Sequence, residues 1–235
     1  FENYVILDQT LFYPEGGGQP ADIGRLLSEN SMARVVHTFK LGEIILHKVE
    51  GGDIERGIQI KGVVDEDFRL AMMRHHTATH VLLHAAKRVL GAHIHQAGAQ
   101  KGFESSRLDL RHFRHITPDE LKKVEIEANR IILENQKVIV EWEDRTTAEQ
   151  KYGFDLYQGG VPPGKTIRVV KVSGDVQACA GTHCRSTGEI GCLKIIRVEH
   201  VQDGIERVEF AAGLSFPQYP ICRRPKPFLI LHAIS

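Results

Sequence analysis

The chain has 235 residues, and its apolar fraction of 42 % and charged fraction of 26 % are those of an ordinary globular protein with one large or two modest domains. Its 30 lysines and arginines balance 30 aspartates and glutamates, so net charge does not favour a nucleic-acid partner such as DNA, and RNA would need a local basic patch. No apolar run is long enough to span a membrane, no secretory signal is visible, and the four cysteines do not resemble a disulfide framework. We therefore expect a cytoplasmic protein and, because residue 1 is Phe rather than Met, a piece of a longer chain.

The first part of the chain, residues 1–64, is predicted to be a β-rich domain. Short runs rich in Val, Ile, Tyr and Phe are separated by turns that contain Gly or Asp, and they lie at 4–13, 33–40, 43–50 and 57–64. Closely spaced short strands of this kind favour a small β-barrel or a tightly curled sheet.

A helical pattern replaces the strand pattern in residues 68–90. Asp67 is placed to cap the start of this helix, and Gly91 is placed to end it. One apolar stripe with helical spacing is formed by Ala78, Val81, Leu82, Ala85 and Val89. The stripe predicts a long helix with one buried face.

A second helix is predicted to begin at Thr117, because Pro118 and Glu120 follow it in the pattern of a capping box. Further strands are expected at 137–143, 166–172, 192–199 and 205–213, with a short helix over 146–151. Strands that flank two helices without regular βαβ alternation predict an α+β fold, with an α/β sandwich core over 65–213. The Pro-rich, basic residues 214–235 are predicted to form an irregular tail.

Two pairs of possible metal ligands stand a hundred residues apart. His76 and His80 are four residues apart on the predicted helix and therefore share a face, although such a pair alone is equally compatible with packed or surface histidines. Cys179 and His183 have the same spacing in a stretch that contains glycine. Thiolate and imidazole are the ligands that zinc prefers, so the two pairs together predict a tetrahedral site for one Zn²⁺ ion. His75 is expected at the surface or beside the ligands.

Four motifs in order resemble the editing domain of alanyl-tRNA synthetases, most of all the archaeal form, and the related stand-alone editing proteins. They are LDQTLFYPEGGGQPADIG near the N-terminus, HTATH at 76–80, GAHIHQAGAQ with RLDLRHF after it, and CAGTH at 179–183. The similarity covers roughly Val5 to Gly213. It does not include the segment in which that family binds ATP and alanine.

The resemblance implies an ester hydrolase that removes serine or glycine attached by mistake to the acceptor end of alanine tRNA. It places Thr79 and Gln96 at the reacting end of the pocket, where the threonine hydroxyl would bond the serine side chain. Without the resemblance, Thr79 would bond its own helix backbone and Gln96 would be a surface amide. A set of substrate contacts is expected from the glycine loop and from basic side chains: Gly16, Gly17, Gly18, Arg74, Arg107 and Arg111. An ordinary turn and solvated surface charges are the alternatives for this set.

Two questions stay open, namely the role of the zinc ion and the function of the chain. Four protein ligands close a tetrahedron, so zinc either activates water when one ligand is weak or only organises two segments. The function is either alanyl-type editing or the editing of a threonyl-tRNA synthetase, which shares the metal pattern. The third reading is a zinc-stabilised tRNA-binding module without catalysis.

Overall fold

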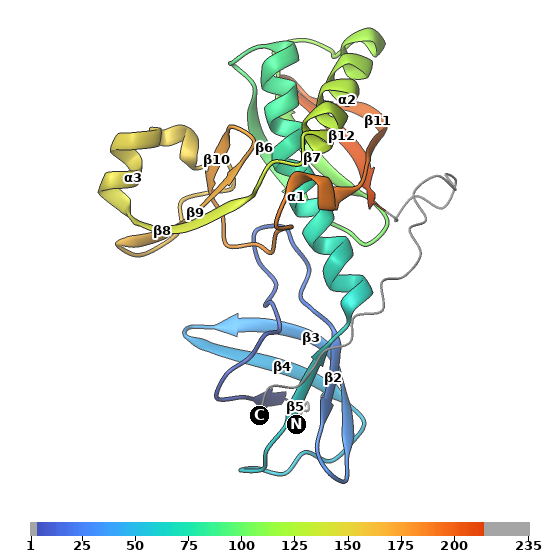
Figure 1. The fold of residues 1–235 in the computed structure, drawn as a ribbon, viewed down its shortest axis with the longest axis vertical. Helices are drawn as coiled ribbons and strands as arrows, with labels where there is room; N and C mark the ends of the chain where they lie inside the picture. The colour runs from blue at the N-terminus through green and yellow to red at the C-terminus, as the bar shows by residue number, and fades with distance from the viewer. Residues whose placement is uncertain (1–3, 214–235) are drawn as a thin grey trace.

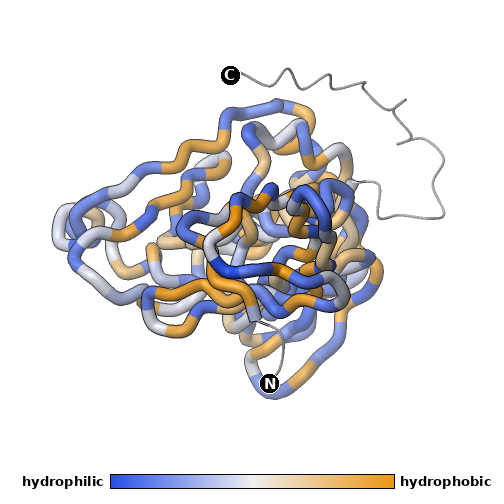
Figure 2. Tube along the Cα trace, turned by 90° about the horizontal axis from the view of Figure 1, so that it is seen from below, coloured by the Kyte–Doolittle hydropathy of each residue, from blue (hydrophilic) through white to orange (hydrophobic). Residues whose placement is uncertain are grey.

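The computed structural model describes residues 4–213, and the predicted tail at 214–235 lies outside them. Three antiparallel sheets and two long helices make up the fold (Figure 1). Hydrophilic and hydrophobic stretches are interleaved along the chain (Figure 2), and buried and less buried residues alternate along strands such as Ser106–Arg111, which is typical of sheets with one face in the core. The described helices include none that is long and apolar enough to cross a membrane.

The N-terminal sheet is open and lies at one end of the molecule. Its strand order is β1-β4-β3-β2-β5, so β1 and β5 form its two edges and the predicted barrel is wrong. Its strands are β1 (Tyr4–Ile6), β2 (Gly24–Leu27), β3 (Met32–Leu41), β4 (Ile44–Glu50) and β5 (Lys61–Val64). The prediction of one long strand over 4–13 was also wrong, because residues 7–23 leave the sheet as a loop that runs toward the rest of the molecule (Figure 1).

The long helix α1 (Glu66–Leu90) leads from this sheet into the remainder of the fold. Its cap is Asp65, whose side chain accepts from the Phe68 amide, so the cap lies two residues before the predicted Asp67. Gly91 ends the helix as predicted, with a φ of 121° that favours glycine. The helix α2 (Pro118–Leu133) packs beside α1 and has the predicted capping box at Thr117.

Helices α1 and α2 cover one face of a four-stranded antiparallel sheet with the order β11-β12-β7-β6. Its strands are β6 (His95–Gln100), β7 (Ser106–Arg111), β11 (Leu193–Gln202) and β12 (Ile205–Ala212). Leu108, Leu110, Val208 and Phe210 point from this sheet into the largest apolar cluster, which α1 and α2 complete. This arrangement confirms a mixed fold of helices on antiparallel strands.

A smaller three-stranded sheet extends to one side, with β10 against α1 (Figure 1). It contains β8 (Ile139–Asp144), β9 (Thr166–Val172) and β10 (Asp175–Ala178), and the short helix α3 (Arg145–Tyr152) confirms the helix predicted there. Two 3₁₀ turns, η1 (Phe154–Leu156) and η2 (Thr187–Ile190), complete the elements. The chain that leaves β10 returns toward α1, and this return brings the two predicted ligand pairs together.

The N-terminal sheet buries a histidine that sets an expected pH dependence of stability. His47 on β4 is fully buried, its Nδ1 bonds the Val5 carbonyl at 3.0 Å, and its Nε2 bonds the Thr10 hydroxyl at 2.8 Å. Burial lowers the pKa of His47 below 6.5. In the unfolded chain the imidazole takes up a proton near its ordinary pKa, so stability is lost as the pH falls from about 6.5 through the folded-state pKa. We expect His47→Gln to reduce the change in urea midpoint between about pH 7.5 and 5. An unchanged pH dependence would contradict this.

Candidate metal centre

Four donor atoms from two distant segments converge beside α1. His76 and His80 come from α1, and Cys179 and His183 come from the stretch after β10; their ligand atoms all lie within 4.8 Å of one another. The sulfur of Cys179 lies 3.3 Å from Nε2 of His76 and 3.4 Å from Nε2 of His183. Nitrogen and sulfur donors this close together can hold a metal ion.

Each of the three imidazoles is held from behind by a second side chain. Nδ1 of His76 bonds Oε1 of Gln19 at 2.7 Å, and Nδ1 of His80 bonds Oδ2 of Asp175 at 2.7 Å. Nδ1 of His183 lies 3.4 Å from the hydroxyl of Thr77, in weaker contact. Histidines that bind metals usually donate their other ring N–H to such an acceptor, which fixes both tautomer and orientation. The donors and their outer partners therefore fit a divalent ion that prefers nitrogen and sulfur.

Further hydrogen bonds tie the loop that carries Cys179 and His183 to β9 and to α1. Arg168 on β9 donates to the carbonyl oxygens of Cys179 and Gly181, at 2.6 and 3.0 Å. The backbone amide of Cys184 donates to the Thr77 hydroxyl on α1 at 3.0 Å, and Cys184 is not among the residues whose donor atoms form the cluster. A guanidinium from β9 and a hydroxyl from α1 thus help to place the segment that carries Cys179 and His183.

The charges of the cluster suit a cation. Burial lowers the pKa of His76 to about 3 and that of His183 to about 4, so both imidazoles are neutral near pH 7. Burial also disfavours a charged His80, but Asp175 and Cys179 together outweigh this through their hydrogen bonds and charges and raise the pKa to about 9, so a bound ion would displace this proton. Burial alone would raise the pKa of Cys179, yet the surrounding imidazoles lower it well below its usual value. A thiolate among imidazoles, with a carboxylate behind one of them, is a favourable ligand set for a divalent ion.

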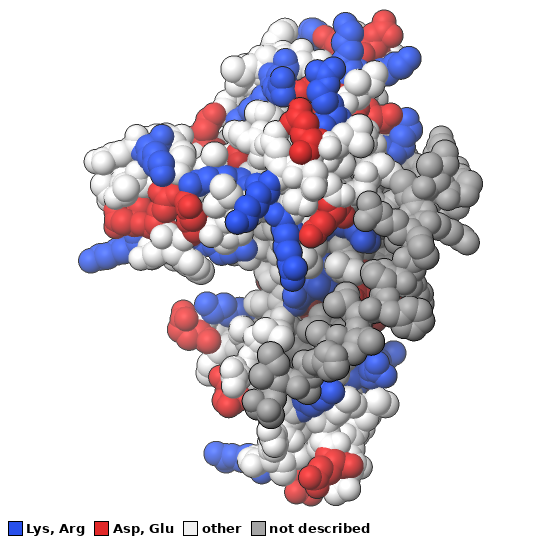
Figure 3. All heavy atoms as spheres, viewed as in Figure 1, with Lys and Arg blue, Asp and Glu red and all other residues white. Residues whose placement is uncertain are grey.

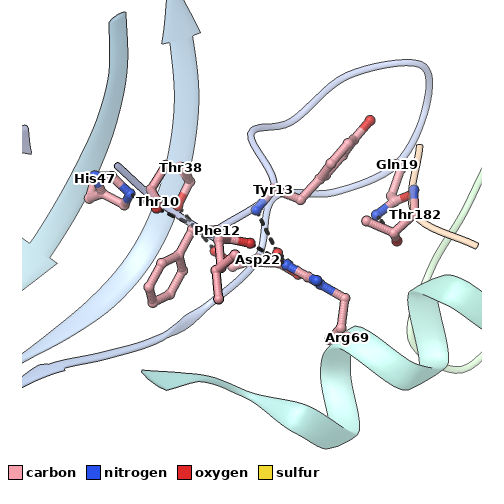
Figure 4. Close-up of polar contacts among 10 residues, drawn as sticks. Thr10, Phe12, Tyr13, Gln19, Asp22, Thr38, His47, Arg69 and Thr182 are labelled. Atoms are coloured by element: carbon pink, nitrogen blue, oxygen red, sulfur yellow. Dashed lines mark hydrogen bonds and ion pairs between the residues drawn. The ribbon is translucent and has the colours of Figure 1, made fainter. Parts of the chain in front are cut away.

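The glycine-rich loop reaches the centre from the N-terminal part of the chain. Gln19 is fully buried; it bonds His76 and also meets Thr182, whose hydroxyl accepts from Nε2 of Gln19 at 2.9 Å (Figure 4). Gly18 has a φ of 71°, and a Cβ there would lie 2.1 Å from the carbonyl oxygen of Ala99 on β6. Glycine is therefore required at this position by both conformation and space.

A buried lysine fastens the same loop. The amide of Lys101 donates to the Gly18 carbonyl at 2.7 Å, and its ammonium group donates to the Gly17 carbonyl at 3.0 Å. Burial lowers the pKa of Lys101 to about 8. The glycine-rich loop thus contacts both the end of β6 and the metal centre, and Gly16 forms an isolated bridge with Gln19.

Thr79 and Gln96 both lie on the side of the sheet that α1 covers. Thr79 is buried, and its hydroxyl donates to the His75 carbonyl at 2.8 Å, the local bond that a helical threonine commonly forms. The lone pairs of that hydroxyl are left to accept from a ligand. Gln96 lies opposite Leu110 of the neighbouring strand β7 and is half-buried. Its backbone N–H donates to Oε1 of Gln158 at 2.8 Å. The pocket roles of both residues stay predictions.

The three predicted arginine contacts are not gathered at the metal centre. Arg74 is half-buried and donates to the Glu189 carbonyl at 3.2 Å. Arg107 and Arg111 alternate with the buried Leu108 and Leu110 on β7, so they point to the face of the sheet opposite α1. Basic and acidic side chains are intermixed over the face in Figure 3, with a short run of basic ones near its centre. Contacts of these arginines with tRNA remain a prediction.

Several residues that build the centre were not expected from the sequence. Gln19 belongs to GGGQP and Lys101 to QAGAQK, but nothing local marks either as a neighbour of a metal site. Asp175 follows a Ser-Gly turn and resembles a turn residue. His75, expected at the surface or beside the ligands, is fully buried, and its Nε2 accepts from the Ala212 amide on β12.

Two family models match the chain. Residues 1–68 match the model described as tRNA synthetases class II (A), and residues 167–209 match the threonyl and alanyl tRNA synthetase second additional domain. The second match begins on β9 and includes Asp175, Cys179 and His183.

Relatives named alanine–tRNA ligase are similar over almost the whole chain. The protein of Methanoregula boonei is 67 % identical over 93 % of this chain and 24 % of its own length. Those of Methanospirillum hungatei and Archaeoglobus fulgidus are 66 % and 54 % identical, over 92 % and 90 % of this chain. The chain spans about a quarter of the length of these relatives. Identity at this level, together with the two family models, places the chain in the alanyl-tRNA synthetase family.

Proposed function

We propose that this chain is an editing hydrolase of the alanyl type, which cleaves the ester bond of seryl- or glycyl-tRNA formed by mistake on alanine tRNA. The observation that carries the proposal is the cluster of three histidines and one cysteine with the glycine-rich loop docked against it. A pocket that selects alanine rejects serine poorly and cannot exclude the smaller glycine by size, so a second, hydrolytic site supplies the missing selectivity.

We propose Zn²⁺ as the ion, with His76, His80, Cys179 and His183 as its ligands. The set of nitrogen and sulfur donors supports zinc over the oxygen-preferring magnesium and calcium. Zinc, when bound, supplies a Lewis acid next to the ester. The protein positions the donor atoms. Helix α1 and the loop after β10 carry the ligands, and the outer partners hold the imidazoles in one tautomer.

The remaining site residues are proposed to position the aminoacyl end. Thr79 would accept a hydrogen bond from the serine hydroxyl, and Gln96 would bond the aminoacyl ester. Gly16, Gly17 and Gly18 would form the wall of the pocket, held by Lys101. Arg74, Arg107 and Arg111 would contact tRNA phosphates. The protein would act in the cytoplasm.

We also propose that 1–64 and 65–213 are separate domains, supported by their separate apolar clusters.

The test measures the hydrolysis of alanine tRNA that has been charged with serine, glycine or alanine, with and without a chelator. We expect release of serine and glycine but not alanine, and loss of release when the metal is removed. Cys179→Ala should lose both zinc and activity, while Cys184→Ala, a matched change at a buried cysteine outside the cluster, should keep both. No release by the metal-loaded protein would refute the hydrolase. Preferential cleavage of threonyl-tRNA would instead indicate the threonyl type.

A substitution at Thr79 tests the origin of serine selectivity. Thr79→Val keeps the shape of the side chain and removes its hydroxyl. One hydrogen bond contributes about 1 kcal/mol, so we expect the rate on seryl-tRNA to fall about fivefold relative to glycyl-tRNA. The ratio of the two rates is the readout, because a general loss of folding would lower both. An unchanged ratio would remove Thr79 from the proposed pocket.

A further inference from the structure

A second cluster of metal-ligating side chains lies at the other end of β12. His115 stands between β7 and α2, His200 lies on β11, and Glu206 lies on β12. Their donor atoms lie within 4.8 Å of one another. Glu206 is six residues from Ala212, the residue that contacts His75, which along a strand corresponds to roughly 20 Å. This cluster is therefore separate from the centre at Cys179.

The chemistry of the cluster centres on a buried carboxylate. The side chain of Glu206 is only 3 % exposed, and Oε1 meets Nδ1 of His200 at 2.8 Å and Nδ1 of His115 at 3.2 Å. An ionised carboxylate out of water needs a compensating positive charge. Its ion-pair partners here are imidazoles, which carry charge only when protonated.

A divalent cation would supply that charge. Two imidazoles and one carboxylate are a ligand set that first-row transition metals occupy in proteins, with the remaining positions open. Both Nδ1 atoms meet the same carboxylate oxygen, and the two rings are inclined at 71° with centroids 4.6 Å apart. His115 and His200 are exposed on their outer sides, which gives an ion a path from solvent. We propose that His115, His200 and Glu206 bind a second divalent cation, Zn²⁺ or a similar first-row transition metal.

An ion at this position would join two segments. It links the connection between β7 and α2 to the hairpin of β11 and β12, which already meet where the His112 amide donates to the Gly204 carbonyl. The proposal does not depend on ester hydrolysis, because it concerns binding at residues outside the site at Cys179.

The experiment titrates metal-free protein with Zn²⁺ and counts bound ions by calorimetry and metal analysis. We expect two ions per chain, one tight and one weaker. His115→Ala and His200→Ala should each weaken the second ion by about a hundredfold or more and leave the first in place. Cys179→Ser should have the reverse effect. His93→Ala, which changes a neighbouring exposed histidine outside the cluster, should leave both ions bound.

Substitution with Co²⁺ separates the two sites by spectroscopy. The Cys179 site should show a thiolate-to-cobalt charge-transfer band, and the Glu206 cluster should add only weak ligand-field bands, which disappear in His115→Ala. His115 is largely exposed, so this variant folds even if changes at Glu206 do not. A single ion in the unmodified protein, or a second ion that survives in both histidine variants, would overturn the proposal.

Discussion

Gly181→Ala is expected to empty the metal centre. A Cβ at residue 181 would lie 1.9 Å from Cε1 and 2.2 Å from Nδ1 of His76, and 3.0 Å from Oε1 of Gln19. The added methyl group would therefore push the imidazole out of line with Cys179 and break its bond to Gln19. Loss of one outer partner typically lowers metal affinity ten- to a hundredfold, and here ligand and partner move together. We expect zinc affinity and ester hydrolysis each to fall about a hundredfold or more.

The matched control is Gly159→Ala. A Cβ there meets only Nε2 of Gln96, at 3.9 Å, and its backbone lies outside the left-handed region, so alanine is accommodated. Zinc content and affinity are measured by competition with a coloured chelator, and circular dichroism compares the fold of both variants. A Gly181→Ala protein that binds zinc as tightly as the control would show that the loop yields to the methyl group. The assignment of Gly181 as a close-approach position would then be wrong.

Local spacing was enough to predict the four donors of this centre, because each pair stands four residues apart in one segment. Their outer partners were not predictable in the same way. Gln19 and Asp175 reach His76 and His80 across 57 and 95 residues of chain, and only the docking of the loop and of β10 brings them there. Such contacts depend on tertiary packing. A single sequence contains no periodic pattern or residue spacing from which that packing can be predicted.

The fold shows the same limit. The capping box at Thr117 and the stop at Gly91 are local hydrogen-bonding patterns, and both were predicted correctly. The barrel was wrong because closure depends on whether the edge strands β1 and β5 pair, which strand propensity does not determine. The short strand β2 was missed because its four residues GRLL have neither alternation nor β-branched side chains. His75 was misplaced because a polar residue is buried where both of its ring nitrogens find partners.

Asp22→Ala is expected to destabilise the joint between the N-terminal sheet and α1. Asp22 is fully buried, while Arg69 on α1 is about a quarter exposed. The guanidinium of Arg69 bonds both carboxylate oxygens, with Nε at 2.9 Å from each, and the Tyr13 amide donates to Oδ2 at 2.6 Å (Figure 4). Removing one partner of a buried ion pair leaves the other charge uncompensated and costs about 3 to 5 kcal/mol. We expect a loss of about 3 kcal/mol in the free energy of unfolding.

The exposed pair of Arg34 and Glu50 provides the contrast for this measurement. Its side chains are 68 % and 56 % exposed, so Glu50→Ala should cost about 1 kcal/mol or less. Urea unfolding of both variants, followed by far-UV circular dichroism, compares the two pairs in one protein. Equal losses would mean that the Asp22 pair is no better shielded from water than the surface pair. Because the Asp22 segment leads directly from Gln19, Asp22→Ala should also weaken zinc binding, whereas Glu50→Ala should not. The joint between the two parts of the chain then acts as a support for the metal centre.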